Sequence, residues 1–366
     1  MRRKRVQAAP KRRNVALRSA PHAASSPADA DMPTRRVRDI GAVAAAAKVS
    51  VATVSRALQR PEMVSEETRQ RVYEAIERLG YTPNAQARNL RTAKTRLVIA
   101  LVPDIANPFF SEVIRGMEQV AHENGYSVLL GDTQSSLARE QTYADMVAAR
   151  QVDGLITLMR HIPKIQLGGR LPIVNACEYV KNRDITSVRV DNVAAAKVAV
   201  NHLLTLGHRR IAFVSGPADS PISIDRRNGY ETALKQAGLP ARASLIAPGD
   251  FSMESGLRAI EYFLAQKQKF TAVFCSNDEM AIGAMRALAT HGLNVPGDVS
   301  VVGFDDIRFA RYTSPPLTTI AQPKNELGRE AMRMLIELLN DPATPVLKRV
   351  LSADLVVRGS TSRCAE

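Results

Sequence analysis

The sequence predicts a small all-α headpiece with a helix-turn-helix, followed by an α/β body of two doubly wound parallel-sheet lobes. Three observations predict this fold class. Residues 39–80 place apolar side chains at helical spacing, and residues 97–366 alternate short apolar strands with amphipathic helices. At 366 residues, the chain also exceeds what one hydrophobic core ordinarily holds.

The charge of the chain is concentrated at its beginning. Residues 1–96 hold 21 Lys and Arg against 8 Asp and Glu, whereas the remaining residues hold 29 against 28. This asymmetry points to a polyanion partner for the first part, most often nucleic acid. Residues 1–35, rich in Arg, Ala, Pro and Ser, are expected to be a disordered basic tail, with a transit peptide as the alternative.

The headpiece, residues 36–82, is predicted to hold three short helices. Asp39 caps the first, whose apolar residues from Ile40 to Ala47 share one face. Ser50 caps the second, Val51–Leu58, which is short and polar outside. Ser65 caps the third, whose stripe is Val72, Ile76 and Leu79 and which ends at Gly80. Two helices joined by a tight turn are typical of a helix-turn-helix, which places its second helix in the major groove.

The body, residues 96–360, is predicted from its alternation of strands and helices. Because βαβ units imply parallel strands, and because the segment is long, two sheets are favoured over one. The expected strands are Leu97–Val102, Ser127–Gly131, Gly154–Leu158, Ile173–Ala176, Ser187–Val190, Ile211–Ser215, Ala272–Cys275, Val299–Phe304, Leu317–Ile320 and Leu355–Val357. The expected helices include one starting at Phe110, then Leu137–Arg150, Val193–Leu206, Glu279–His291 and Glu326–Leu339.

A ligand crevice is expected where the parallel strands end. Phe109 and Phe110 follow the first strand there, and Phe251 is a third aromatic candidate for stacking on a nucleobase or a sugar face. Asp305 follows a buried strand and can accept bonds from two ribose hydroxyls, while Glu178 follows another strand. The alternatives are core packing for the Phe residues and capping for Asp305.

Several motifs in order resemble the Lac repressor (LacI/GalR) family of bacterial transcription regulators. They are Val49–Leu58, Val64–Arg69, Gly80–Asn84, Asn107–Phe110, Gly207–Ile211, Ser276–Ala281 and Pro315–Ile320, and the resemblance covers about residues 37–360. Within the family, Val102–Ile105 and Ile320–Pro323 are similar to the cytidine-responsive branch. The resemblance implies a body like that of periplasmic binding proteins, with a small effector held between its lobes.

The resemblance also implies DNA-binding residues. In the second helix, Val51 and Ala52 face bases and Arg56 donates to guanine. Ser50 and Thr53 bond phosphates, and Ser55 is exposed on the same face. Residues 83–95 form a hinge helix and linker, in which Asn84 lies near the start and Leu90 is a wedge for the minor groove. The alternatives are a solvated Arg56, simple capping by Ser50 and Thr53, and a Leu90 that packs on the body.

In the body, the resemblance implies that Arg226, Asn277 and Asp305 bond the polar edges of the effector, with capping as the alternative for Asn277. The expected effector is a nucleoside, cytidine or a relative, and a sugar is the alternative.

The predicted function is an effector-controlled transcriptional repressor that binds a palindromic operator as a homodimer, in the cytoplasm at the nucleoid. A solute-binding receptor for a sugar or nucleoside is the alternative. An enzyme is disfavoured, because no G-x-G-x-x-G, P-loop, G-x-S-x-G or H-x-x-x-H motif occurs. No catalytic residue, metal, cofactor or membrane partner is therefore expected. The three cysteines lack a C-x-x-C pair and fit a reducing cytosol.

Overall fold

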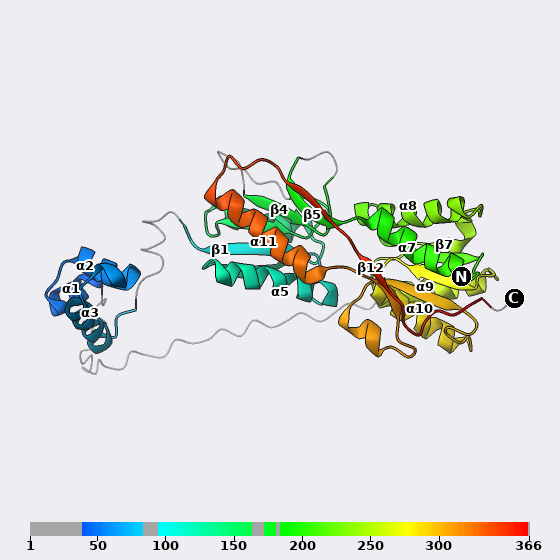
Figure 1. Cartoon of the computed structure of the whole chain (residues 1–366), viewed down its shortest axis with the longest axis horizontal. Helices are drawn as coiled ribbons and strands as arrows, with labels where there is room; N and C mark the ends of the chain where they lie inside the picture. Colours follow the sequence, from blue (N-terminus) through cyan, green and yellow to red (C-terminus); the bar gives the residue numbers. More distant parts are fainter. Residues whose placement is uncertain (1–38, 83–93, 163–171, 181–183, 365–366) are drawn as a thin grey trace, which may run out of the picture. The chain divides into compact units, whose positions relative to one another are not determined.

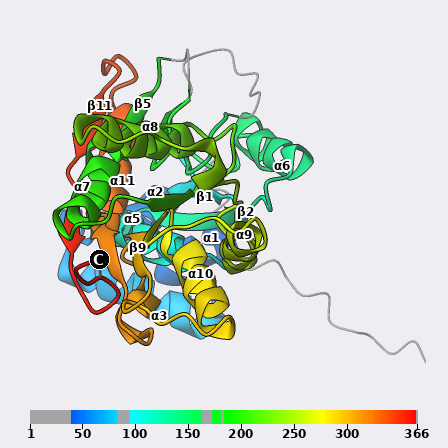
Figure 2. The ribbon, with the colours of Figure 1, turned by 90° about the vertical axis from the view of Figure 1, so that its right-hand side faces the viewer.

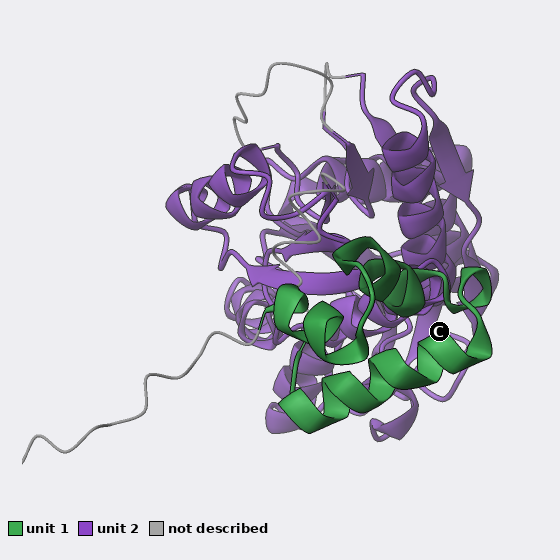
Figure 3. Cartoon of the chain, turned by 90° about the vertical axis from the view of Figure 1, so that its left-hand side faces the viewer, with its two compact units in different colours: residues 1–85 green, residues 86–366 purple. Residues whose placement is uncertain are grey.

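The structure is a computed structural model that describes residues 39–82, 94–162, 172–180 and 184–364. It divides into two compact units, Met1–Ala85 and Gln86–Glu366, which are coloured separately in Figure 3. The first unit holds the predicted headpiece and the second holds the predicted body. The boundary between them falls inside the predicted linker, residues 83–95.

The headpiece contains α1 (Ile40–Ala47), α2 (Val51–Gln59), the short 3-10 helix η1 (Pro61–Met63) and α3 (Glu66–Leu79) (Figure 1). As predicted, Asp39 caps α1, because its carboxylate accepts a bond of 2.8 Å from the Ala42 amide. Lys48 makes the turn to α2 with a left-handed backbone, φ 55°. A small core of short apolar side chains joins the three helices, built on Val43, Val54 and Val72.

Two predictions for α3 hold in outline, because Ser65 occupies the N-cap position and Val72, Ile76 and Leu79 all pack in or against the headpiece core, but both differ in detail. Ser65 precedes α3, but its hydroxyl donates to the Thr68 hydroxyl at 3.0 Å and makes no capping bond to a backbone amide. The buried stripe of α3 runs through Val72 and Ala75, whereas Ile76 and Leu79 are only partly buried. The core of three helices is too small to cover more of α3.

The first lobe of the body has a parallel sheet in the order β11-β5-β4-β3-β1-β2. Its strands are β1 (Leu97–Val102), β2 (Ser127–Asp132), β3 (Gly154–Thr157), β4 (Ile173–Ala176), β5 (Thr186–Val190) and β11 (Lys348–Leu351). The helices are α5 (Pro108–Glu123), α6 (Leu137–Ala148) and α11 (Lys324–Asn340). Strand β1 is apolar throughout because alternate residues enter different cores: Ala100 packs in one and Leu101 in the other.

The second lobe has a sheet in the order β12-β10-β9-β8-β6-β7, parallel except where β12 pairs with β10. Its strands are β6 (Ile211–Val214), β7 (Ile246–Ala247), β8 (Ala272–Cys275), β9 (Ser300–Asp305), β10 (Thr318–Ala321) and β12 (Asp354–Val356). Helices α7 (Asn192–Thr205) and α8 (Pro221–Gln236) cover one face, and α9 (Met253–Ala265) and α10 (Asp278–Thr290) cover the other (Figures 1 and 2). Short 3-10 helices η2 (Ala243–Leu245) and η3 (Arg308–Tyr312) complete the lobe.

The chain passes between the two lobes three times. It crosses from β5 to α7, returns from β10 to α11, and crosses again from β11 to β12. The two-lobed, mostly parallel architecture predicted from the sequence is therefore confirmed. The strands predicted at Leu97–Val102, Ile173–Ala176 and Ala272–Cys275 have the observed bounds, and the other predicted strands and helices differ at their ends by a few residues.

The third crossing was not fully predicted from the sequence. Strand β11 has the sequence KRVL and lies at the edge of the first sheet, where most of it is exposed. Because it lacks the apolar run that marks a buried strand, its sequence carries little signal. Strand β7, two residues long, is equally hard to recognise.

Among the described residues, no single helix is long and apolar enough to cross a membrane. The bent pair α1 and α2 passes the same test by length and composition only, and its apolar side chains form the headpiece core.

Candidate functional site

Helix α2 presents the residues predicted to face DNA. Val51 is 47% exposed, Ala52 and Arg56 are exposed, and Val54 and Ala57 on the opposite face are buried. Ser55, which was expected to be exposed, is partly buried, and Leu58 at the end of the inner face is also only partly buried. A short helix with one face in the core and the other free is the geometry that enters a major groove.

The first turn of α2 is capped by Ser50, the residue before the helix. The Ser50 hydroxyl accepts a bond of 3.1 Å from the Thr53 amide and lies 2.9 Å from the Thr53 hydroxyl. The capping alternative for Ser50 is thus present in the structure. It leaves the role in phosphate binding a prediction. Asn84 and Leu90 lie outside the described residues.

A cavity of about 250 Å³ lies between the two lobes at the carboxyl ends of their strands. All seven residues predicted to bind the effector line it: Phe109, Phe110, Glu178, Arg226, Phe251, Asn277 and Asp305. This volume is slightly below the roughly 300–1,000 Å³ of pockets for drug-sized ligands, so the cavity suits a small molecule. The structure therefore brings these seven residues to one place.

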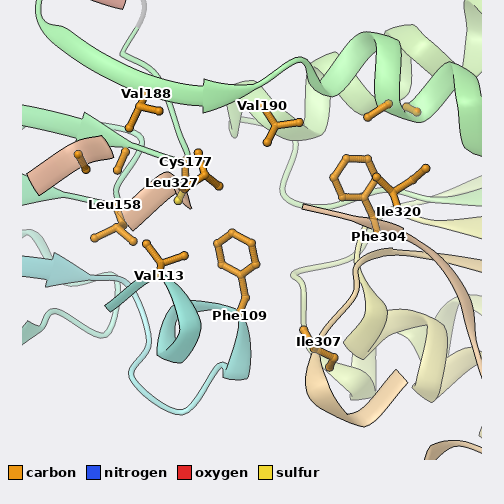
Figure 4. Packing of buried hydrophobic residues seen from close by; sticks show 14 of the residues in the cluster. Phe109, Val113, Leu158, Cys177, Val188, Val190, Phe304, Ile307, Ile320 and Leu327 are labelled. Carbon is orange, nitrogen blue, oxygen red and sulfur yellow. The ribbon is translucent and has the colours of Figure 1, made fainter. Parts of the chain in front are cut away.

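The aromatic walls come from both lobes. Phe109 and Phe110 begin α5, with ring centroids 5.2 Å apart in an edge-to-face arrangement. Phe109 also belongs to the apolar cluster that contains Phe304 of the second lobe. Figure 4 shows the two rings among the labelled residues of this cluster. Phe251 has a left-handed backbone, φ 71°, and its ring lies over Gly216, where any Cβ would clash. Core packing and ligand stacking are therefore compatible for Phe109.

Arg226 and Asp305 form the polar centre of the cavity. Both are buried, with Arg226 only 3% exposed. The Arg226 guanidinium donates to the Asn192 side chain at 2.9 Å and to the Ser276 carbonyl, and its carbon lies 3.7 Å from the centre of the Phe304 ring. Its Nη1 is 3.8 Å from an Asp305 carboxylate oxygen.

Burial raises the pKa of Asp305 to about 6, and the nearby Arg226 opposes that rise. The Gln322 amide donates to the same carboxylate oxygen at 2.6 Å. The carboxylate is thus held from both sides, and its other oxygen is not part of these contacts. This is the arrangement expected for an acceptor of ligand hydroxyl groups.

Asn277 is used within the protein. Its side-chain oxygen accepts a bond of 2.9 Å from the Met280 amide, which caps α10, and its NH₂ group donates to the Phe251 carbonyl at 2.9 Å. The capping alternative for Asn277 is therefore present in the structure. Its contribution to a ligand would come from positioning Phe251 or from a second bond of the same amide.

Glu178 extends from the first lobe toward the second. Its Oε1 accepts a bond of 3.2 Å from the Ser220 hydroxyl, whereas its Oε2 is buried without a hydrogen-bond partner among the described residues. Burial raises the pKa of Glu178 to about 7. A buried oxygen that lacks a partner is costly unless something else fills its bonding capacity.

The cavity also contains polar residues that sequence reasoning missed. They include Gln322, Glu279, Arg160 and His161. Arg160 of the first lobe pairs with Asp219 of the second at 3.2 Å, and the Asn107 side chain donates to Glu279 at 3.4 Å. These contacts join the lobes at the cavity. In the sequence, these residues were marked only by a position next to a strand end or within a motif. Such a position does not distinguish them from ordinary loop residues.

No group of three or more His, Cys, Asp or Glu side chains among the described residues is arranged to hold a metal ion. Burial raises the pKa of the Cys177 and Cys275 thiols, as for small core residues.

Two family models match the chain. Residues 39–84 match the model described as "Bacterial regulatory proteins, lacI family", and residues 200–361 match the one described as "Periplasmic binding protein-like domain". Together they match the headpiece and the part of the body after residue 200, while the motif at Asn107–Phe110 lies outside both.

Curated relatives extend the similarity over most of the chain. The HTH-type transcriptional repressor CytR of Escherichia coli strain K12 is 42% identical over 323 residues, which is 87% of this chain and 95% of that protein. The cytidine-repressor resemblance within the family is thereby confirmed. Catabolite control protein A of Priestia megaterium is 39% identical over 304 residues, covering 81% of this chain and 91% of that protein.

A solved structure shares the architecture. The lac repressor dimer, bound to operator and the anti-inducer ONPF, superposes with a TM-score of 0.77 at 29% identity and covers 87% of this chain and 98% of that chain. Neither the relatives nor this structure supports the alternative of a solute-binding receptor without a DNA function. The relatives are named as transcriptional repressors and control proteins and not as enzymes. The chain belongs to the lacI family of bacterial regulatory proteins and is a DNA-binding transcriptional repressor with an effector-binding body.

Proposed function

We propose that this repressor is controlled by a neutral nucleoside, cytidine or a close relative, bound in the cavity between its lobes. The observation that carries the proposal is the composition of the cavity. Aromatic walls from both lobes, Phe109, Phe110 and Phe251, surround a polar centre formed by Arg226 and Asp305. A flat base suits the rings, and a ribose diol suits the carboxylate. A plain sugar would use fewer aromatic walls.

The charges of the cavity favour a neutral ligand over a phosphorylated one. Five carboxylates line it, at Asp104, Glu178, Asp250, Glu279 and Asp305. Two arginines, Arg160 and Arg226, lie among them, and each has a carboxylate or carbonyl partner within the protein. Even with Glu178 and Glu279 protonated, a phosphate would meet three carboxylates and two arginines in a site of low dielectric. Nucleosides should therefore bind better than nucleotides.

The proposal also assigns a role to each part of the chain. Residues 36–82 bind DNA bases and phosphates, residues 83–95 act as hinge helix and linker, and residues 96–360 bind the effector and form a homodimer, while the basic tail of residues 1–35 adds nonspecific DNA affinity. The related lac repressor structure is a dimer on its operator, and two headpieces on a twofold axis suit a palindromic operator. Asn84 and Leu90 are assigned to the hinge, where Leu90 would wedge into the minor groove.

In this proposal the protein acts by binding and not by catalysis, in the cytoplasm at the nucleoid. Effector binding closes the lobes about the three crossings and changes operator affinity, with a coupling of typically about 1–3 kcal/mol.

The test is a ligand screen by thermal shift with the full chain. Cytidine, uridine, adenosine, cytidine 5′-monophosphate, ribose and glucose are compared at equal concentration, since a ligand of the native state raises the unfolding temperature. We expect nucleosides to stabilise the protein more than the nucleotide and the free sugars. A response to sugars alone would overturn the nucleoside assignment and leave the repressor assignment intact.

A further inference from the structure

Helix α11 begins with a buried lysine. Lys324 is 5% exposed and is the first residue of the helix. Burial disfavours an ammonium ion, and so does the positive end of a helix dipole. Lys324 therefore occupies a position that two effects oppose, and its contacts must compensate for both.

Those contacts are to the backbone of one turn. The Lys324 ammonium donates to the Asp305 carbonyl at 2.6 Å and to the Asp306 carbonyl at 2.7 Å. A carboxylate of α5, Glu112, is farther away, at 3.9 Å. The lysine thus holds a piece of main chain more closely than it pairs with an acid.

The turn that it holds has an unusual backbone. Asp305 has φ 117° and Asp306 has φ 52°, in the region that side chains with a Cβ disfavour. Such conformations persist only where the surroundings impose them. Here the Ile307 amide donates to the buried Asp278 carboxylate at 2.8 Å, and Arg358 donates to Asp306 at 2.6 Å.

Lys324 differs from these other contacts in its origin. Asp278, Asp306 and Arg358 all belong to the second lobe, whereas α11 packs in the first lobe against α5 and the first sheet. Residues 322–324 form the second crossing between the lobes, and Gln322 of the same segment donates to the Asp305 carboxylate. The crossing therefore holds both the side chain and the backbone of Asp305.

We propose that Lys324 is a positioning residue for effector binding: it fixes the turn at Asp305 and Asp306 so that the Asp305 carboxylate faces the ligand in the cavity. This inference rests on the proposed function for the identity of the ligand, whereas the contacts of Lys324 do not depend on it. Lys324 itself does not line the cavity.

The first experiment separates positioning from plain stabilisation. Lys324→Met keeps the length of the side chain and removes its donors. Isothermal titration of the full chain compares cytidine with 2′,3′-dideoxycytidine, which lacks the hydroxyls assigned to Asp305. We expect cytidine affinity to fall about tenfold and dideoxycytidine affinity by less than about twofold. The double variant Lys324→Met with Asp305→Ala should bind cytidine as weakly as Asp305→Ala alone, because the two residues act as a unit.

Equal losses for the two ligands, or additive losses in the double variant, would overturn the proposal. Lys235→Met, which removes a charge from an exposed lysine on α8, is the matched control and should change neither affinity. If Lys324→Met does not fold, Lys324→Gln retains an NH₂ donor group on a shorter side chain and should give a smaller loss of the same selectivity.

The second experiment does not depend on the ligand. Hydrogen exchange of the ligand-free chain measures protection of the Ile307 amide, which reports how well the turn is held. We expect faster exchange there in Lys324→Met and unchanged exchange in Lys235→Met. If the wild type binds neither nucleoside, the proposed effector is wrong, and this measurement alone decides the role of Lys324. Unchanged Ile307 protection would then overturn it.

Discussion

In the headpiece, Val51 and Arg56 lie exposed on α2, whereas in the body Arg226, Asn277 and Asp305 are buried and bonded to neighbouring groups of the protein. The first surface is complete only when a partner covers it. The second is already organised, with hydrogen bonds that hold each side chain in place before a ligand arrives. Both regions bind a partner, DNA in the headpiece and the effector in the body, but only in the body are the binding side chains already held by hydrogen bonds to the rest of the protein.

The difference teaches which substitutions separate function from stability. An exposed residue can be removed with little effect on the free energy of unfolding, usually within about 0.5 kcal/mol. A buried residue with several partners cannot, because its removal leaves other groups without theirs. Headpiece variants should therefore lose binding alone, and body variants should lose binding together with some stability.

The largest expected effect is that of Asp305→Ala. It removes the acceptor assigned to the ribose hydroxyls and leaves Gln322 and Arg226 with one partner fewer, each change costing about 1–3 kcal/mol. The thermal shift caused by cytidine should disappear, while circular dichroism shows a folded body with a lower unfolding temperature. Glu261→Ala, at an exposed site on α9, is the control. A cytidine shift that survives in Asp305→Ala would contradict the assigned role.

The next effect is on the pH dependence of stability, through Glu178. Its pKa is raised from about 4.5 to about 7 by burial. Between these values the native state keeps a proton that the unfolded state has lost. The free energy of unfolding should therefore fall as pH rises from about 4.5 to 7 and stay level above that, by up to about 3 kcal/mol from this group.

Urea unfolding of wild type and Glu178→Gln between pH 4.5 and 8 measures this contribution. The variant should lose part of the slope, and the difference between the two curves isolates Glu178 from Asp305 and Glu279, whose pKa values are also raised. Glu62→Gln, at an exposed site in the headpiece, controls for the substitution itself. Parallel curves for wild type and Glu178→Gln would show that the Glu178 carboxyl gains no proton on folding.

Arg56→Ala probes the exposed side of the comparison. Operator binding should weaken by about 1–3 kcal/mol and specificity should relax at one base pair, because arginine donates two bonds to guanine. The unfolding temperature should stay unchanged. Fluorescence anisotropy with operator and with random DNA checks both points. An equal loss on the two DNAs would mean that Arg56 contacts only a phosphate.

The same contrast explains how much could be predicted from the sequence. In α2, capping by Ser50 and the apolar positions at Val54 and Ala57 are local, so the exposed face followed directly from spacing. In the effector site, Phe109, Glu178 and Asp305 could be predicted from their places at or after strand ends, because parallel strands end at one edge of a sheet and Asp305 is the last residue of β9. Arg226 and Asn277 were predicted only from the family resemblance.

The remaining parts depend on contacts between distant segments. Gln322 and Lys324 approach Asp305 from the next crossing of the chain, and nothing in their own neighbourhood indicates that they are buried. Strand β11 pairs with β5 at the edge of the first sheet, although most of the second sheet and α11 lie between these two strands in the sequence, and its residues are mostly exposed. Such pairings are fixed by the tertiary fold and overrule local pattern.

The smallest expected effect belongs to the basic tail, which lies outside the described residues. Deleting residues 1–33 removes eight Lys and Arg and two Asp. If these charges reach DNA phosphates, the salt dependence of binding should flatten by up to about 0.9 for each phosphate that the shortened chain no longer neutralises. The ratio of operator to random DNA affinity should barely move, since phosphate contacts carry no sequence information. Titrations at several salt concentrations measure both quantities. An unchanged slope would confine the DNA contacts to the part of the chain after residue 33, whereas a weaker operator preference would show that the tail also reads sequence.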